Sequence, residues 1–173
     1  MKSYNKFAIL VVLVFAVAQF ALATPLDDYV AAPDANYRYS LENTIKGDGY
    51  TAYVLNMISQ SWRSKSQVDR TLWQHWLTIV KPEKVSDNTA LLWITGGSNA
   101  IIAYTFDKFW TTGDVNWPLL LPMVKSAVRA MDTVHDCMAS ISKGTLDINK
   151  FVVSGASKRG WTTWLTAAVD RRV

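Results

Sequence analysis

The fold of this chain is decided by the stretch Phe151-Val152-Val153-Ser154-Gly155-Ala156-Ser157-Lys158-Arg159-Gly160-Trp161. It opens with apolar residues that end at a glycine, which is typical of a strand buried on both faces. Residues 162–169 continue with apolar side chains at helical spacing. Ser157 is therefore expected in a sharp turn between a strand and a helix. This is the setting of a nucleophile elbow, in which the helix N-terminus stabilises the negative charge that develops during attack.

The spacing of the glycines leaves the chemistry of this turn open. A nucleophile elbow follows G-x-S-x-G, whereas here Arg159 stands at the second glycine position and Gly160 comes one residue later. The phosphate-binding loop G-x-x-x-x-G-K-[ST] also fits the two glycines, but Trp161 replaces its essential lysine, which argues against a nucleotide site. A plain strand-to-helix turn with Ser157 as the helix N-cap is an equal alternative.

The N-terminus has the features of a secretory signal peptide. A basic start over residues 1–6 precedes an apolar run that ends in the small-x-small site Ala21-Leu22-Ala23. We expect residues 1–23 to be cleaved and residues 24–173 to be secreted, with an uncleaved signal anchor as the alternative. Cleavage removes two lysines and lowers the formal net charge of +4 by two. The remaining charge gives no reason to expect binding to nucleic acid or, after cleavage, to a membrane.

Cysteine and histidine usage gives no sign of a metal or a cofactor. Cys137 is the only cysteine, so it cannot form a disulfide within the chain. His75 and His135 lie far apart in the sequence, and neither has a cysteine or histidine at ligand spacing. We expect no cofactor and no metal, assign Cys137 and His135 to packing, and interpret His75 as a hydrogen-bonded core or surface histidine.

The rest of the chain is predicted to consist of strands and one long helix. Patterns of apolar residues predict strands over 50–61, 73–80 and 90–95, loose alternation over 100–110, and a helix over 122–142. The polar residues 24–48 are expected to be extended. Together with the stretch around Ser157, this order predicts an α/β fold: a mostly parallel sheet with flanking helices, preceded by N-terminal antiparallel strands.

A double glycine follows the strand predicted over 90–95. In esterases, a glycine-rich loop at this place supplies half of the oxyanion hole, and the N–H after the nucleophile supplies the other half. The sequence therefore predicts Ser157 as the nucleophile, with the backbone N–H groups of Gly97 and Lys158 holding the oxyanion. An ordinary Gly-Gly turn is the alternative. A catalytic serine also needs a base and an acid. In the α/β-hydrolase order both follow the serine, where the chain offers only Asp170.

Six blocks of the chain carry a resemblance to a known family. They are Thr24–Val30, Trp73–Thr78, Gly96–Asn99, Ile101–Phe109, Leu121–Asp132 and Gly155–Trp161. Together these blocks resemble the PhoPQ-activated pathogenicity-related family, which includes secreted autocrine proliferation repressor proteins. The resemblance implies an α/β-hydrolase-like fold with Ser157 at the nucleophile position. It also implies that some members act as extracellular signals.

The chain departs from the family pattern in two places. It ends after the helix that follows Ser157. In addition, Gly96–Asn99 runs directly into Ala100–Ala103, where family members have a further helix and strand. We therefore expect an incomplete α/β-hydrolase-like sheet with an internal deletion near residues 99–100. The missing strand would leave a gap in the sheet, with exposed apolar faces and unpaired backbone.

Two functions of different kinds follow. The first is a secreted hydrolase of an ester or peptide, represented here by a fragment that lacks a full catalytic triad and is inactive by itself. The second is a secreted, non-enzymatic autocrine signal that represses cell proliferation through a receptor. The expected partner is accordingly a small-molecule or peptide substrate, or a cell-surface receptor.

Overall fold

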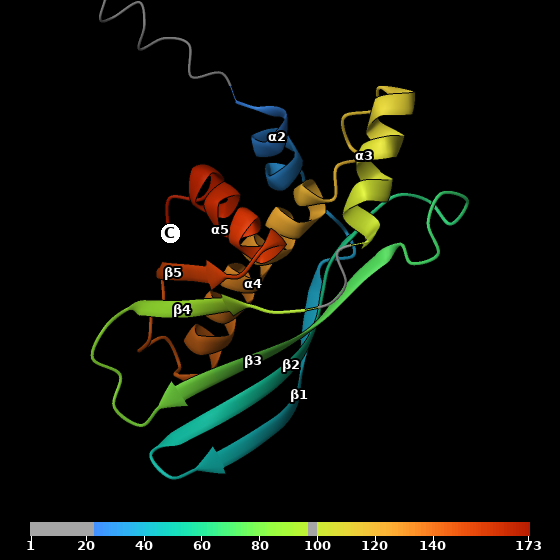
Figure 1. Ribbon diagram of the computed structural model, residues 1–173. Helices are drawn as coiled ribbons and strands as arrows, with labels where there is room; N and C mark the ends of the chain where they lie inside the picture. Colours follow the sequence, from blue (N-terminus) through green and yellow to red (C-terminus); the bar gives the residue numbers. More distant parts are fainter. Residues whose placement is uncertain (1–22, 97–99) are drawn as a thin grey trace, which may run out of the picture.

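The computed structural model describes residues 23–96 and 100–173. The elements are α2 (Pro25–Ala31), β1 (Arg38–Gly47), β2 (Tyr50–Ser61), β3 (Leu72–Pro82), β4 (Thr89–Ile94), α3 (Ala100–Thr112), α4 (Leu120–Ile141), β5 (Lys150–Gly155) and α5 (Lys158–Val169). The strands β1 to β3 form one end of the molecule, and the helices α2, α3 and α5 lie at the other (Figure 1).

The first three strands form an antiparallel sheet in the order β1-β2-β3. The β1–β2 hairpin closes with the pair Gly47 and Tyr50 and turns through Asp48-Gly49, where glycine readily takes the positive φ that the second loop position requires. Gly49 has a φ of +76°. The central strand β2 buries Leu55 and Met57 against α4.

The last two strands form a separate parallel pair. In this pair, β4 and β5 are aligned so that Thr89 lies opposite Lys150 at one end and Ile94 lies opposite Gly155 at the other. One face of this pair packs into the core, where Phe151 and Val153 are buried. The opposite face is exposed. The parallel pair therefore has only one covered face, although parallel sheets are normally covered on both.

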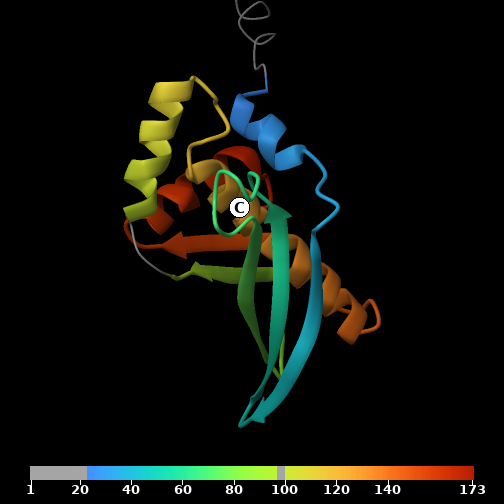
Figure 2. The same ribbon diagram turned by 90° about the vertical axis from the view of Figure 1, so that its right-hand side faces the viewer.

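Helix α4 supplies the centre of the core. Its 22 residues bury an apolar stripe that includes Val124, Met131 and Met138. This stripe contacts residues of both sheets and of α2 and α5 in one cluster. Figure 2 shows α4 running alongside the antiparallel sheet and beneath α5.

The prediction of an α/β-hydrolase-like, mostly parallel sheet is wrong. The described residues contain a three-stranded antiparallel sheet and a two-stranded parallel sheet, and no hydrogen bonds join β3 to β4. The hairpin connections of β1 to β3 impose antiparallel pairing, so only β4 and β5 remain to pair in parallel. The expected internal deletion near residues 99–100 stays a prediction.

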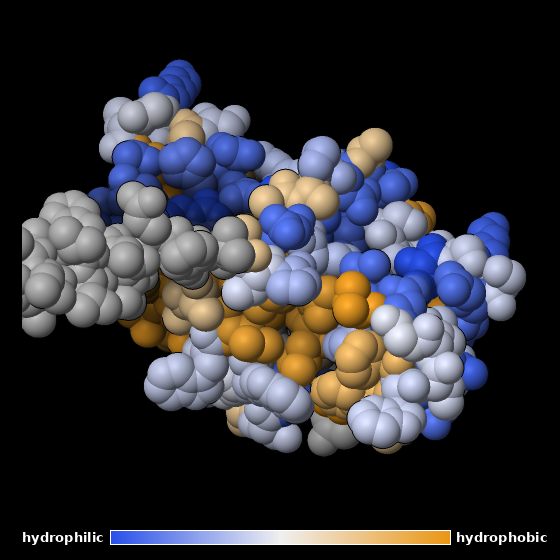
Figure 3. Space-filling model, turned by 90° about the horizontal axis from the view of Figure 1, so that it is seen from above, coloured by the Kyte–Doolittle hydropathy of each residue, from blue (hydrophilic) through white to orange (hydrophobic). Residues whose placement is uncertain are grey.

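Two helices and one strand lie where the sequence did not predict them. Residues 24–48 were expected to be extended; their first part forms α2 instead, while their second part is the extended strand β1, and the loosely alternating residues after 100 form α3. Thr24 caps α2 in a capping box with Asp27. Seen from above, the helical end shows apolar side chains across its middle, with hydrophilic side chains around them (Figure 3). The large exposed apolar side chains of α3 and α5 include Ile101, Tyr104, Trp110, Trp161 and Trp164.

Candidate functional site

Ser157 lies in a strained turn, which we call the Ser157 turn (residues 155–158). Its backbone has φ 55° and ψ −124°, a combination that residues with a side chain rarely adopt. The turn joins the end of β5 to the start of α5, and the serine itself is exposed. Strained residues of this kind persist only where the surroundings hold them, and they cluster at functional sites. The turn is therefore the first candidate for a functional site.

Close packing of α5 against β5 requires glycine at positions 155 and 160, on either side of Ser157. A Cβ on Gly155 would lie 2.6 Å from Cβ of Arg159 and 3.0 Å from the Arg159 carbonyl carbon and oxygen. A Cβ on Gly160 would lie 3.0 Å from the carbonyl oxygen of Gly155. Helix α5 thus approaches the end of β5 so closely that a side chain at position 155 would clash and one at position 160 would be tight. The G-x-S-x-x-G spacing, which departs from the usual elbow motif, serves this close contact.

Ser157 does not act as a side-chain N-cap. Within the described residues its hydroxyl makes no capping hydrogen bond to α5, although its carbonyl oxygen accepts the N–H of Trp161 at 3.1 Å. Ser157 therefore occupies the N-cap position of α5, as the alternative predicted, but without a capping hydrogen bond from its side chain. The hydroxyl borders a depression lined by Lys158 and Trp161 and, from α3, by Ile102 and Ala103.

The predicted oxyanion donors are only partly described. Gly97 lies outside the described residues, so its predicted role stays a prediction. Lys158 is buried at the first position of α5, and burial together with the neighbouring Arg159 charge lowers the pKa of its amino group. The guanidinium of Arg159 donates a hydrogen bond to the carbonyl oxygen of Gly96. The end of β4 and the start of α5 are thereby joined beside Ser157.

Both histidines are engaged in hydrogen bonds with residues other than Ser157. Nε2 of His75 lies 3.0 Å from the hydroxyl of Ser59, and burial lowers the pKa of this imidazole. Nδ1 of His135 lies 3.1 Å from the carbonyl oxygen of Ile148. The carboxylate of Asp170 accepts hydrogen bonds from the Arg172 side chain, the shortest at 2.6 Å. Among the described residues, the structure therefore does not bring a base or an acid to Ser157.

A buried polar chain connects the sheet to the helices, and sequence reasoning missed it. The Ser59 hydroxyl links His75 to Ser126 of α4, at 2.9 Å from the Ser126 hydroxyl. The Gln60 amide donates to the Ser126 hydroxyl at 3.2 Å and accepts from the Tyr29 hydroxyl at 2.8 Å. Burial raises the pKa of Tyr29. The signal in the sequence was the pair Ser59-Gln60, two adjacent polar residues near the end of a strand that is mostly apolar.

The described part of the chain gives one result on metal binding and one on membrane-spanning helices. Across residues 23–96 and 100–173, no group of three or more histidine, cysteine or acidic side chains is placed to hold a metal ion. No helix in the same residues has the length and apolar character needed to cross a membrane. The residues 1–22 of the predicted signal peptide lie outside the described part.

Comparison with known proteins places the chain in a family. The model of the PhoPQ-activated pathogenicity-related proteins matches residues 26–100 and 98–173, so the chain belongs to this family, as the sequence blocks predicted. Over 213 aligned positions it is 31% identical to autocrine proliferation repressor protein A of Dictyostelium discoideum. That match covers 95% of this chain and 42% of the relative, so the chain spans about two fifths of the relative's length. No solved structure gives a significant match.

Proposed function

We propose that this protein is secreted and restrains cell proliferation as an extracellular signal, by binding rather than by catalysis. The observation that carries the proposal is the similarity to autocrine proliferation repressor protein A, which extends over 95% of this chain. The signal-peptide pattern of residues 1–23 supports secretion.

The geometry of the described residues supports a binding role. His75 and His135 are engaged in hydrogen bonds with Ser59 and with the Ile148 carbonyl oxygen. Large apolar side chains are exposed on the sheets, with Trp76 69% and Trp93 62% accessible to solvent. Exposed apolar surface of this kind is characteristic of protein–protein contact sites. A receptor with an apolar contact surface is the partner that this chemistry fits.

The test is a growth assay with the purified protein as the added factor. Dictyostelium discoideum cells are grown with increasing amounts of the protein, and the doubling time is measured against the same protein unfolded by heat. The proposal predicts a doubling time that lengthens with dose only for the folded protein. A doubling time that is the same with folded and unfolded protein overturns it.

A second candidate function is acyl transfer with Ser157 as the nucleophile. The observation that favours it is the strained backbone of this exposed serine at the start of α5, where N–H groups favour a developing negative charge. In this candidate the N–H groups of Lys158 and Gly97 hold the oxyanion, and the substrate is an ester or peptide.

A fluorophosphonate probe distinguishes the two candidates. The acyl-transfer candidate predicts one covalent adduct in the intact mass of the protein, which is lost in Ser157→Ala and kept in Ser154→Ala. The binding proposal predicts no adduct in any of the three proteins, because Ser157 is not activated.

A further inference from the structure

A groove separates the two sheets, and we call it the β3–β4 groove. It is lined by residues 76–82 of β3 and residues 89–93 of β4, with Val134 and Met138 of α4 as its floor. Its volume is about 730 Å³. A second cavity of about 410 Å³ shares Trp76, Leu92 and Trp93 with it and extends it to Gly96 and Lys158. The groove therefore runs along the whole of β4.

The two strands that border the groove each have an edge without a partner strand among the described residues. β3 pairs only with β2, and β4 pairs only with β5. In Figure 1 the strands lie in the order β5, β4, β3, β2, β1, and residues of β3 and β4 line the same groove. Natural proteins usually protect such edges, because unpaired N–H and C=O groups are a template for another strand.

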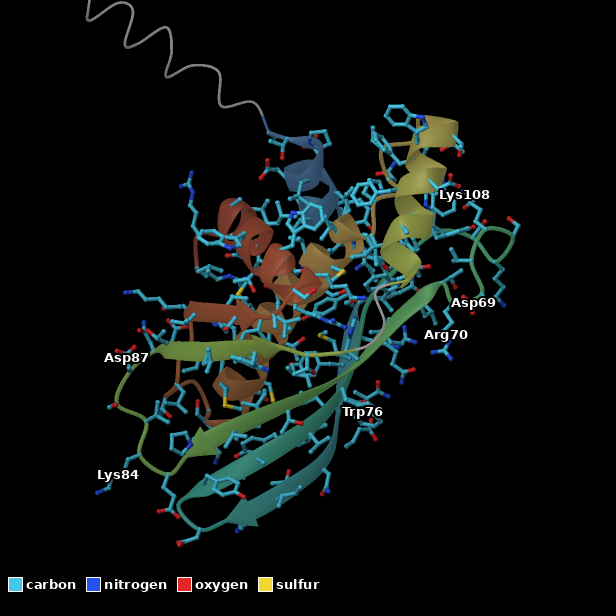
Figure 4. All side chains as sticks on the ribbon, viewed as in Figure 1. Asp69, Arg70, Trp76, Lys84, Asp87 and Lys108 are labelled. Atoms are coloured by element: carbon cyan, nitrogen blue, oxygen red, sulfur yellow. The ribbon has the colours of Figure 1, made fainter. Side chains whose placement is uncertain are left out.

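The walls of the groove are apolar on the solvent side as well. Trp76 and Val80 of β3 are 69% and 59% exposed, and Leu91 and Trp93 of β4 are 65% and 62% exposed. Lys84 and Asp87 lie on the loop that joins the two strands at one end of the groove (Figure 4). An occupant with apolar side chains on both of its faces would contact α4 with one face and extend the surface of Trp76 and Trp93 with the other.

The comparisons indicate that relatives carry additional chain, and the division of the family match points to its place. The family match is divided into two parts that meet at residues 98–100, directly after β4. The alignment with the Dictyostelium relative has 213 positions, more than the 173 residues of this chain, so the relative has residues without a counterpart here. A segment inserted at residues 98–100 starts beside Gly96, which lines the groove.

We infer that the β3–β4 groove takes up an extended β-strand supplied in trans by a longer member of the family, from the segment that such members carry between β4 and α3. The strand pairs with the free edges of β3 and β4 and joins the two sheets. A length of about six residues matches β4. Backbone hydrogen bonds on both edges supply affinity, and the alternating side chains supply specificity. This inference shares the exposed Trp76 and Trp93 with the proposed receptor contact, but its test measures strand binding and not proliferation.

The test uses peptides from the Dictyostelium relative. The alignment with autocrine proliferation repressor protein A leaves some residues of the relative without a counterpart in this chain. Those that fall between the counterparts of β4 and α3 are tiled as short overlapping peptides. Binding to the full chain is measured by titration calorimetry, and amide hydrogen exchange is measured with and without peptide. We expect one peptide to bind and to slow exchange in residues 72–82 and 89–94 together, because it pairs with both edges.

Matched variants locate the binding site. Trp76→Glu and Trp93→Glu place a charge in the groove walls at exposed positions, and each is expected to weaken peptide binding about tenfold or more. Trp110→Glu is the control, because Trp110 is 87% exposed on α3 and lies outside the groove. Near-ultraviolet circular dichroism verifies that all variants are folded.

Three outcomes overturn the inference. The first is that no peptide of the segment binds to the folded protein. The second is that a peptide binds but leaves exchange in β3 and β4 unchanged, or binds equally well to Trp76→Glu and to Trp110→Glu. The third is a dimer of this chain in which β3 and β4 are already protected without peptide, since a second copy would then occupy the groove.

Discussion

Replacing Ser157 by glycine should make the protein more stable. Ser157 holds φ 55° and ψ −124°, a conformation that costs a residue with a side chain about 1–3 kcal/mol and costs glycine little. Glycine in turn loses about 0.5–1 kcal/mol, because it makes the unfolded chain more flexible. The net expectation for Ser157→Gly is a gain of about 1 kcal/mol in the free energy of unfolding.

Ser157→Ala and Ser154→Gly are the matched controls. Alanine keeps the Cβ and with it the strain, so Ser157→Ala should lie within about 0.5 kcal/mol of the wild type. Ser154 is in β5, where the backbone is ordinary, so Ser154→Gly should lose about 0.5–1 kcal/mol.

Urea unfolding followed by tryptophan fluorescence measures these differences. A gain of about 1 kcal/mol moves the midpoint of unfolding upward by roughly 0.5 M, for a typical urea dependence of about 2 kcal/mol per M. If Ser157→Gly is no more stable than Ser157→Ala, the backbone at this position is not strained, and the reasoning about the Ser157 turn fails.

Three further substitutions test the contacts that hold the molecule together. Gly155→Ala should destabilise the protein by about 1–3 kcal/mol in urea unfolding, because its Cβ would lie 2.6 Å from a carbon atom of α5; unchanged stability would show that α5 is not so close. Lys125→Met should cost about 1.5–3 kcal/mol and speed proteolysis of α2, because the buried amino group donates to the carbonyl oxygens of Tyr29 and Ala32 at 3.2 and 2.7 Å; a protein with equal protease resistance contradicts this. Burial lowers the pKa of His75, so the imidazole takes up a proton more readily in the unfolded chain. The contribution of neutral His75 to the free energy of unfolding should be fully present above the pKa of the unfolded imidazole, about 6.5. It should fall as the pH drops through that value toward the lower pKa of the folded protein. His75→Gln should remove this component, and an identical pH dependence in both proteins would count against it.

Patterns of local origin could be predicted from the sequence. The strand β2 has the predicted bounds, and β3, β4 and α4 agree with their predictions within about two residues, because each carries an apolar period of its own. The strand, turn and helix around Ser157 were found in the same way. The family was also recognised from sequence blocks alone.

Features that depend on pairing and packing could not be predicted. The division into two sheets follows from the absence of hydrogen bonds between β3 and β4, which no local pattern encodes. Helix α3 was missed because Ile102 and Phe109 pack against a buried cluster made by Trp62, Trp117 and Leu119, a contact across the fold. The start of α2 was missed although its signal is local, a threonine followed three residues later by an aspartate. The engagement of His75 by Ser59 joins neighbouring strands and needed the register of β2 and β3.

The central claim is that the protein restrains proliferation by binding, without covalent chemistry at Ser157. The measurement that tests it most directly is the doubling time of Dictyostelium discoideum cells across a dose series of wild-type protein and of Ser157→Ala. The account predicts that both proteins lengthen the doubling time with the same dose dependence. A Ser157→Ala protein that is folded but leaves growth unchanged, while the wild type slows it, would contradict the account.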